Sequence, residues 1–129
     1  MFLCVPYHDD SWIPHLLIMT TKLIDTTALE AALDAFATAR NWHQFHSPKN
    51  LAMALTGEVG ELVEIFQWRT EEESWQVANQ AETAEHVRQE LADVALYLVR
   101  LASVLKVDLN QAIADKMILN AQKYPPLSE

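Results

Sequence analysis

The chain has 129 residues, 50% of them hydrophobic, with only two glycines and a formal net charge of −9. This length fits one domain with its own core, and the scarcity of glycine favours long helices over a turn-rich β protein. The excess of negative charge repels phosphate backbones, which argues against a nucleic-acid partner. A triphosphate would be repelled too, so an acidic protein that handles phosphates is expected to use a divalent metal.

The cysteine content and the hydropathy of the chain narrow the class of protein further. The single cysteine, Cys4, excludes an internal disulfide and a cysteine-based zinc site, and it is compatible with a cytoplasmic protein. The most apolar stretch, Val94 to Leu105, is short and interrupted by Arg100, so no membrane span is expected.

The N-terminal region lacks the basic segment of a signal peptide. Met19 offers a second translation start, and whether it is the true start stays open. The expected division is an N-terminal extension over residues 1–22, one domain over 23–126, and a tail over 127–129.

Four helices are expected, in an all-α four-helix bundle. The first begins at the capping box of Thr27 and Glu30 and runs to about Arg40. The second begins at Ser47-Pro48, a cap followed by a first-turn proline, and ends near Trp68. After a connection over 69–79 with one helical turn, the third runs from about 79–82 to about 106. The fourth is capped at residue 108 and ends before the prolines at 125–126.

Carboxylates occupy unusual positions on the second and third helices. On a helical wheel Glu58 lies inside the apolar stripe of its helix, and Glu61 lies at the edge of that stripe. Glu90, Asp93 and Tyr97 share a strip beside the core face of the third helix. That helix is apolar almost all round, which predicts that the whole helix is buried. Its apolar stripe consists of Val87, Leu91, Val94, Leu98 and Leu105.

No basic residue lies three or four positions after any of these four acids on its helix. Burying an ionised carboxylate without a partner costs several kcal/mol, so the two acidic pairs call for a cation between them. Oxygen ligands without His or Cys favour Mg²⁺, or Mn²⁺ as a substitute, over zinc. The glutamates at positions 64, 71, 72, 73, 82 and 85 are expected to be solvated.

Both glycines, Gly57 and Gly60, lie in mid-helix and bracket Glu58. Each costs about 1 kcal/mol relative to alanine there. They leave a bare strip that either a ligand or a neighbouring helix could approach closely.

The segments GEVGELVEIFQW and QELADVALYLV resemble the two acidic motifs of the all-α, MazG-like nucleoside triphosphate pyrophosphatases. Among these, RNWHQFHSPKNL before them and VDLNQAIADKMILNAQKYP after them are similar to the dCTP pyrophosphatase branch, so the resemblance covers residues 29–125. It implies Mg²⁺-dependent hydrolysis of nucleoside triphosphates to monophosphate and pyrophosphate, a house-cleaning of the cytoplasmic nucleotide pool. It also implies assembly into homodimers or homotetramers.

Carried over by position, the resemblance makes Glu58, Glu61, Glu90 and Asp93 the catalytic ligands of one or two Mg²⁺ ions. Its implied substrate-binding residues are Trp42, His46, Trp68, Tyr97, Lys116, Asn120, Lys123 and Tyr124. One departure is Leu33, which stands where members of the branch have a histidine near the base. The substrate therefore stays open among dCTP, other deoxynucleotides and modified cytosine nucleotides.

Two rival interpretations remain. A non-enzymatic helical oligomerisation or interaction module would explain the amphipathic helices and the glycine strip, but not a glutamate among leucines. A carboxylate-bridged di-iron bundle needs a Glu-x-x-His motif, which the chain does not contain.

Overall fold

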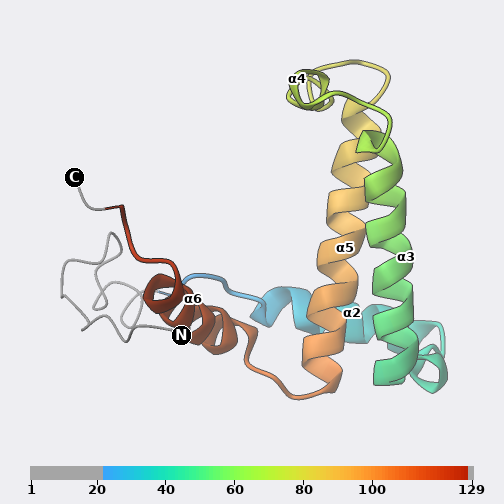
Figure 1. The fold of residues 1–129 in the computed structure, drawn as a ribbon. Coiled ribbons are helices and arrows are strands. Elements are labelled where there is room, and N and C mark those ends of the chain that lie inside the picture. The colour runs from blue at the N-terminus through green and yellow to red at the C-terminus, as the bar shows by residue number, and fades with distance from the viewer. Residues whose placement is uncertain (1–21, 128–129) are drawn as a thin grey trace. The chain divides into compact units, whose positions relative to one another are not determined.

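The computed structural model describes residues 22–127. In chain order it contains α2 (Thr27–Ala39), the 3-10 turn η1 (His43–Phe45), α3 (Pro48–Phe66), α4 (Glu71–Ser74), α5 (Ala84–Val104) and α6 (Leu109–Lys123), as Figure 1 shows. No strand occurs within this range. The all-α class is therefore confirmed, and the helices follow the predicted order with ends shifted by a few residues. The predictions that concern Cys4 and Met19 lie outside the described residues. The predicted extension over residues 1–22 lies almost entirely outside them, and so do the last two residues of the predicted tail.

The described residues form two units. One unit consists of residues 27–107 and carries α2, η1, α3, α4 and α5. The other consists of residues 22–26 and 108–127 and is built around α6. Within this second unit the side-chain oxygen of Asn110 accepts hydrogen bonds from the backbone N–H groups of Leu23 at 2.8 Å and Ile24 at 3.1 Å.

Local signals set the helix ends. The Ser47 hydroxyl accepts a hydrogen bond from the Asn50 N–H at 3.2 Å, and Pro48 occupies the first turn of α3. At the start of α6 the Asp108 carboxylate accepts one from the Gln111 N–H at 2.9 Å. Both predicted caps are thereby confirmed. The structure includes Thr27 in α2 as its first helical residue, not as the cap residue before the helix.

The helices α3 and α5 lie side by side and run antiparallel, and α2 contacts α5 (Figure 1). Apolar side chains fill the space toward one end of the pair, where Ile65, Val77 and Val87 are buried against Leu62 and Phe66. This pairing brings the acidic segments of the two long helices next to each other.

The prediction that α5 is buried all round is wrong for the chain taken alone. Leu91, Leu98 and Leu105 are exposed, while Glu90 and Arg100 are among the most buried residues of the described chain. The reason is that α2 and α3 cover only part of the helix circumference, and they cover the part that carries these two polar residues.

The predicted bare strip on α3 is also exposed. A Cβ atom added at Gly57 or Gly60 would meet no atom within 4 Å among the described residues. No helix of the described chain therefore makes the close approach that the glycines allow. In this same part of the chain, no helix is long and apolar enough to cross a membrane.

Candidate metal and nucleotide site

Three carboxylates meet between the two long helices. Glu58 of α3 and the pair Glu90 and Asp93 of α5 each offer one oxygen, and these oxygens all lie within 4.8 Å of one another. The two α5 residues are three positions apart and so share a face of that helix. Glu61, the fourth predicted ligand, is exposed and does not belong to this group.

Glu90 is the most buried of these three acids, with only 6% of the residue exposed. Its Oε1 lies 3.0 Å from Nε2 of His86, one helical turn away. Its Oε2 is buried and has no hydrogen-bond partner among the described residues. Leaving a buried acceptor unpaired costs about 1–3 kcal/mol, and more for a charged one. A divalent cation between the three carboxylates would satisfy this oxygen, so the residues present fit a metal ion of the kind that prefers oxygen ligands.

The electrostatics of Glu58 agree with this arrangement. Burial is the main cause that raises the pKa of the Glu58 carboxyl above its ordinary value. The negative charges of Asp93, Glu61 and Glu90 raise this pKa further. The sequence placed Glu58 inside the apolar stripe of its helix, whereas in the structure Glu58 is half-buried and Glu90 is the more buried of the two.

A cavity of about 240 Å³ adjoins the carboxylates. Asp93 belongs both to its lining and to the acidic group. The full lining consists of Leu33, Phe36, Trp42, His46, Asp93, Leu96, Tyr97 and Arg100. Mostly apolar walls with a few convergent polar groups are typical of small-molecule sites.

Aromatic contacts hold one wall of this cavity. The Trp42 ring makes edge-to-face contacts with the rings of Phe36, at 5.6 Å between centroids, and His46, at 6.2 Å. The Arg40 guanidinium lies 3.4 Å above the centre of the Phe36 ring. An indole fixed in this way can present a face on which a nucleobase stacks.

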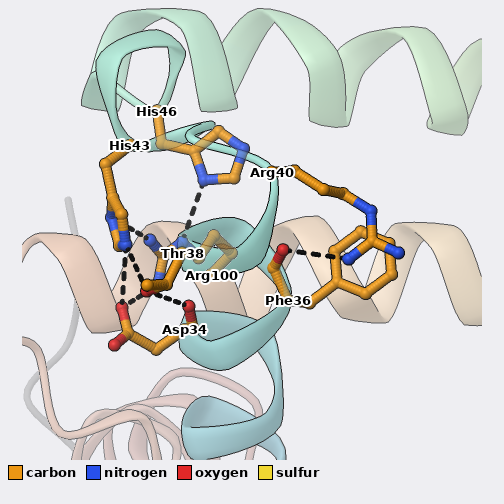
Figure 2. Close-up of polar contacts among 7 residues, drawn as sticks. All are labelled: Asp34, Phe36, Thr38, Arg40, His43, His46 and Arg100. Carbon is orange, nitrogen blue, oxygen red and sulfur yellow. Dashed lines mark hydrogen bonds and ion pairs between the residues drawn. The ribbon is translucent and has the colours of Figure 1, made fainter.

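Arg100 closes another side of the cavity with three hydrogen bonds (Figure 2). Arg100 is only 5% exposed. Its Nε donates a hydrogen bond to His46 Nδ1 at 3.1 Å. Its Nη1 donates to Asp34 Oδ1 at 3.2 Å. Its Nη2 lies 3.1 Å from His43 Nδ1, which must be the acceptor because a guanidinium only donates.

These bonds set the tautomer of both imidazoles, that is, which ring nitrogen carries the proton. His43 Nε2 lies 2.9 Å from the Thr38 hydroxyl, which itself donates to the Asp34 backbone oxygen at 2.8 Å. The His43 proton therefore sits on Nε2, and by the same argument the neutral His46 carries its proton on Nε2. Burial, followed by the charge of Arg100, lowers the pKa of His46 below its ordinary value.

The predicted substrate-binding residues fall into three groups. Trp42, His46 and Tyr97 line the cavity together with Asp93. Trp68 is 89% exposed beyond the end of α3 and is not part of the lining. The others belong to the unit around α6 and stay predictions: Lys116, Asn120, Lys123 and Tyr124.

Sequence reasoning missed Arg100 and its partners Asp34 and His43. Arg100 lies three positions after Tyr97 and seven after Asp93, so all three share one face of α5. Extending the acidic strip by one helical turn would have found it, whereas its partners come from α2 and η1 and have no local signal.

Comparisons with known proteins agree with this fold and site. The sequence model of the MazG-like family matches residues 54–129. The protein named dCTP pyrophosphatase 1 of Rattus norvegicus is 49% identical over 90 residues, which cover 70% of this chain and 53% of that protein. The Homo sapiens protein of the same name is 47% identical over 90 residues, with the same coverage of both chains. The chain thus spans about half the length of the curated relatives it matches.

Among solved structures, a pyrophosphatase from Archaeoglobus fulgidus DSM 4304 superimposes with a TM-score of 0.71 and 39% sequence identity. The match covers 77% of this chain and 91% of that one. The resemblance inferred from the motifs is therefore confirmed. Because the family model matches more than half of its residues, this chain belongs to the MazG-like family.

Proposed function

We propose that the protein is a Mg²⁺-dependent pyrophosphohydrolase of the cytoplasmic nucleotide pool. Its substrates are deoxynucleoside triphosphates, with dCTP or a related or modified nucleotide preferred, and its products are the monophosphate and pyrophosphate. The observation that carries the proposal is that Asp93 belongs both to the carboxylate group and to the cavity. The names of the curated relatives and of the archaeal structure support it.

The three clustered carboxylates would hold the metal ion, with Glu61 on the next turn of α3 as the further ligand expected from the motif. A bound Mg²⁺ supplies charge neutralisation of the triphosphate and Lewis-acid polarisation of a phosphoryl oxygen. In the overall reaction water adds to the α-phosphorus and the bond to the β-phosphate breaks. Mn²⁺ is the expected substitute because it also prefers oxygen ligands.

The protein's own side chains bind and orient the nucleotide. The phosphates belong at the Asp93 end of the cavity, because that residue is shared with the metal group. The base then lies between the apolar walls, where the Trp42 ring can stack on it and exclude water. Positioning of this kind supplies much of the catalysis in phosphoryl transfer, since the transition state is loose and highly charged.

Pyrophosphate release tests this proposal directly. The full chain is incubated with Mg²⁺ and a panel of canonical and modified deoxynucleoside triphosphates. We expect release from at least one of them, and a loss of at least 100-fold in Asp93→Asn with unchanged helical content by circular dichroism. Glu64→Gln, an exposed acid on α3 outside the carboxylate group, is the matched control. If the wild-type chain releases pyrophosphate from none of the nucleotides, the enzyme proposal fails.

A homo-oligomer is proposed as well, because the exposed side chains of Leu91, Leu98 and Leu105 give α5 an apolar face in the single chain. This same face is what favours the rival function of a helical interaction module. Light scattering of wild type and Leu98→Glu tests the oligomer. An oligomer without pyrophosphate release would support the rival function.

A further inference from the structure

The cavity carries opposite charges along one helix. Asp93, Tyr97 and Arg100 line it from one face of α5. At a rise of 1.5 Å per residue, Asp93 and Arg100 are about 10 Å apart along the helix axis. A nucleotide whose phosphates lie near Asp93 would therefore direct its base toward Arg100.

The Arg100 end of the cavity offers hydrogen-bond donors. A guanidinium has five N–H groups, and each of the three nitrogens of Arg100 uses one of them within the described residues. One N–H on Nη1 and one on Nη2 are thus left without a partner among the described residues. The proton on His46 Nε2 adds another donor, because its Nδ1 accepts the bond from Arg100.

The orientation of the guanidinium is fixed from three sides. Asp34 comes from α2, His43 from η1, and His46 follows η1 directly. Two of these partners are neutral imidazoles, and the side chain of Asp34 is 61% exposed to water. The charge of Arg100 is therefore only partly compensated, while its plane is held by bonds to all three nitrogens.

We propose that Arg100 determines base specificity by donating hydrogen bonds to two neighbouring acceptors on the edge of the nucleobase. This inference rests on the proposed function, since it takes the cavity to hold the base. Cytosine presents such a pair at N3 and O2, and guanine presents one at N7 and O6. Uracil and thymine place an N3–H donor between their two carbonyl groups, so the guanidinium would face a donor there.

The expected size of the base selectivity follows from the cost of placing a base without the acceptor pair against Arg100. A good bidentate contact from arginine discriminates against the wrong base roughly 5- to 150-fold. Because Arg100 is buried, a base without the acceptor pair would leave its N–H groups without partners. Selectivity of this size is measurable between dCTP and dUTP, which have nearly the same volume.

The test compares kcat/KM for pyrophosphate release from dCTP, dGTP, dUTP and dTTP in the wild type and in Arg100→Met. We expect the wild type to prefer dCTP or dGTP over both uracil and thymine nucleotides by roughly 5- to 150-fold. The dCTP and dGTP arms show which of the two acceptor pairs is recognised. In Arg100→Met this preference should fall to within about threefold.

A purely structural role for Arg100 predicts a different result. If it only fastens the loop that carries Trp42 and His46, the variant loses activity on all four nucleotides while the preference stays, which would overturn the inference. Arg88→Met is the control, because Arg88 lies on the same helix with an 80% exposed side chain. Should Arg100→Met fail to fold, Arg100→Lys keeps the charge but not the planar fork, and it should lose the preference too.

Equilibrium binding separates this inference from the proposed function. Calorimetric titration of the wild type and the variants with dCMP, dGMP, dUMP and dTMP needs no hydrolysis. Base selectivity that disappears in Arg100→Met would support the inference even if no pyrophosphate were released. Pyrophosphate release without base selectivity in the wild type would refute the inference and leave the proposed function intact. An absence of both binding and release would overturn both.

Discussion

His86 lies one turn before Glu90 on α5, and its Nε2 is 3.0 Å from Glu90 Oε1. The other oxygen, Glu90 Oε2, is buried without a partner among the described residues. One oxygen of this carboxylate thus has a partner within the protein, and the other is left to accept from a bound ion. Partners of metal ligands commonly orient the ligand in this way.

Removing the imidazole should therefore weaken metal binding without removing a ligand. We expect His86→Ala to raise the Mg²⁺ concentration that gives half-maximal activity about 10- to 100-fold. The measurement is a Mg²⁺ titration of pyrophosphate release at saturating nucleotide. Gln89→Ala is the control, since Gln89 bonds only the exposed Glu85 among the described residues. An unchanged titration midpoint in His86→Ala would show that Glu90 needs no support from His86.

Metal should stabilise the fold through the same carboxylates. A ligand that binds only the folded state adds about 2.7 kcal/mol to the free energy of unfolding at 100 times its Kd. We expect Mg²⁺ to raise the melting temperature of the wild type and to have little effect on Glu90→Gln. In EDTA the variant should be at least as stable as the wild type, because a buried charge near two others has been removed. Equal Mg²⁺ stabilisation of both proteins would exclude Glu90 as a ligand.

The lowered pKa of His46 makes stability depend on pH. Its ordinary value is 6.5, and the folded state disfavours the protonated ring. Between that value and the lower folded pKa the unfolded chain binds more protons, so the free energy of unfolding falls as the pH falls. We expect His46→Gln to lose less stability than the wild type between pH 7.5 and pH 5.5.

Urea unfolding at the two pH values, in EDTA, measures this difference. Glu58 contributes with the opposite sign, because its pKa is raised in the folded state, but it is present in both proteins and cancels in the comparison. A steeper loss of stability in His46→Gln than in the wild type would contradict the direction given by burial.

Gly60 should be replaceable at a gain in stability. It lies in mid-helix, and a Cβ there would meet nothing within 4 Å among the described residues. We expect Gly60→Ala to raise the free energy of unfolding by about 0.5–1 kcal/mol, measured by chemical denaturation. A decrease instead would show that a second copy or another segment packs closely against this position. Pyrophosphate release by the stabilised variant then shows whether a ligand needs the bare strip.

The features of this fold that the sequence predicted are local ones. Ser47 and Pro48 start α3 through contacts within one turn, and the spacing of Glu90 and Asp93 places both on one face of α5. Glu58 joins them because α3 and α5 pair along their length. Helical periodicity and caps describe the relationships within each helix, whereas the pairing of α3 with α5 was inferred from their unpaired acids and from the resemblance.

The contacts around Arg100 could not be read in this way. Its partners Asp34 and His46 lie 66 and 54 positions away, and only the packing of α2 and η1 against α5 brings them together. The exposure of Leu98 was missed for a related reason, because periodicity identifies an apolar face but not whether the chain itself covers it.

The position of Glu90, Asp93, Tyr97 and Arg100 on a single helix has a consequence for how this site can change over evolution. One inserted residue between positions 93 and 100 would turn Arg100 by about 100° away from the cavity and move it by 1.5 Å. Insertions there should therefore be excluded among active relatives, while the connection between α3 and α5 can vary in length. The span between the acidic end and the cationic end of the cavity is fixed by a rigid helix, and adaptation to new substrates is left to substitutions in α2 and in the loop before α3.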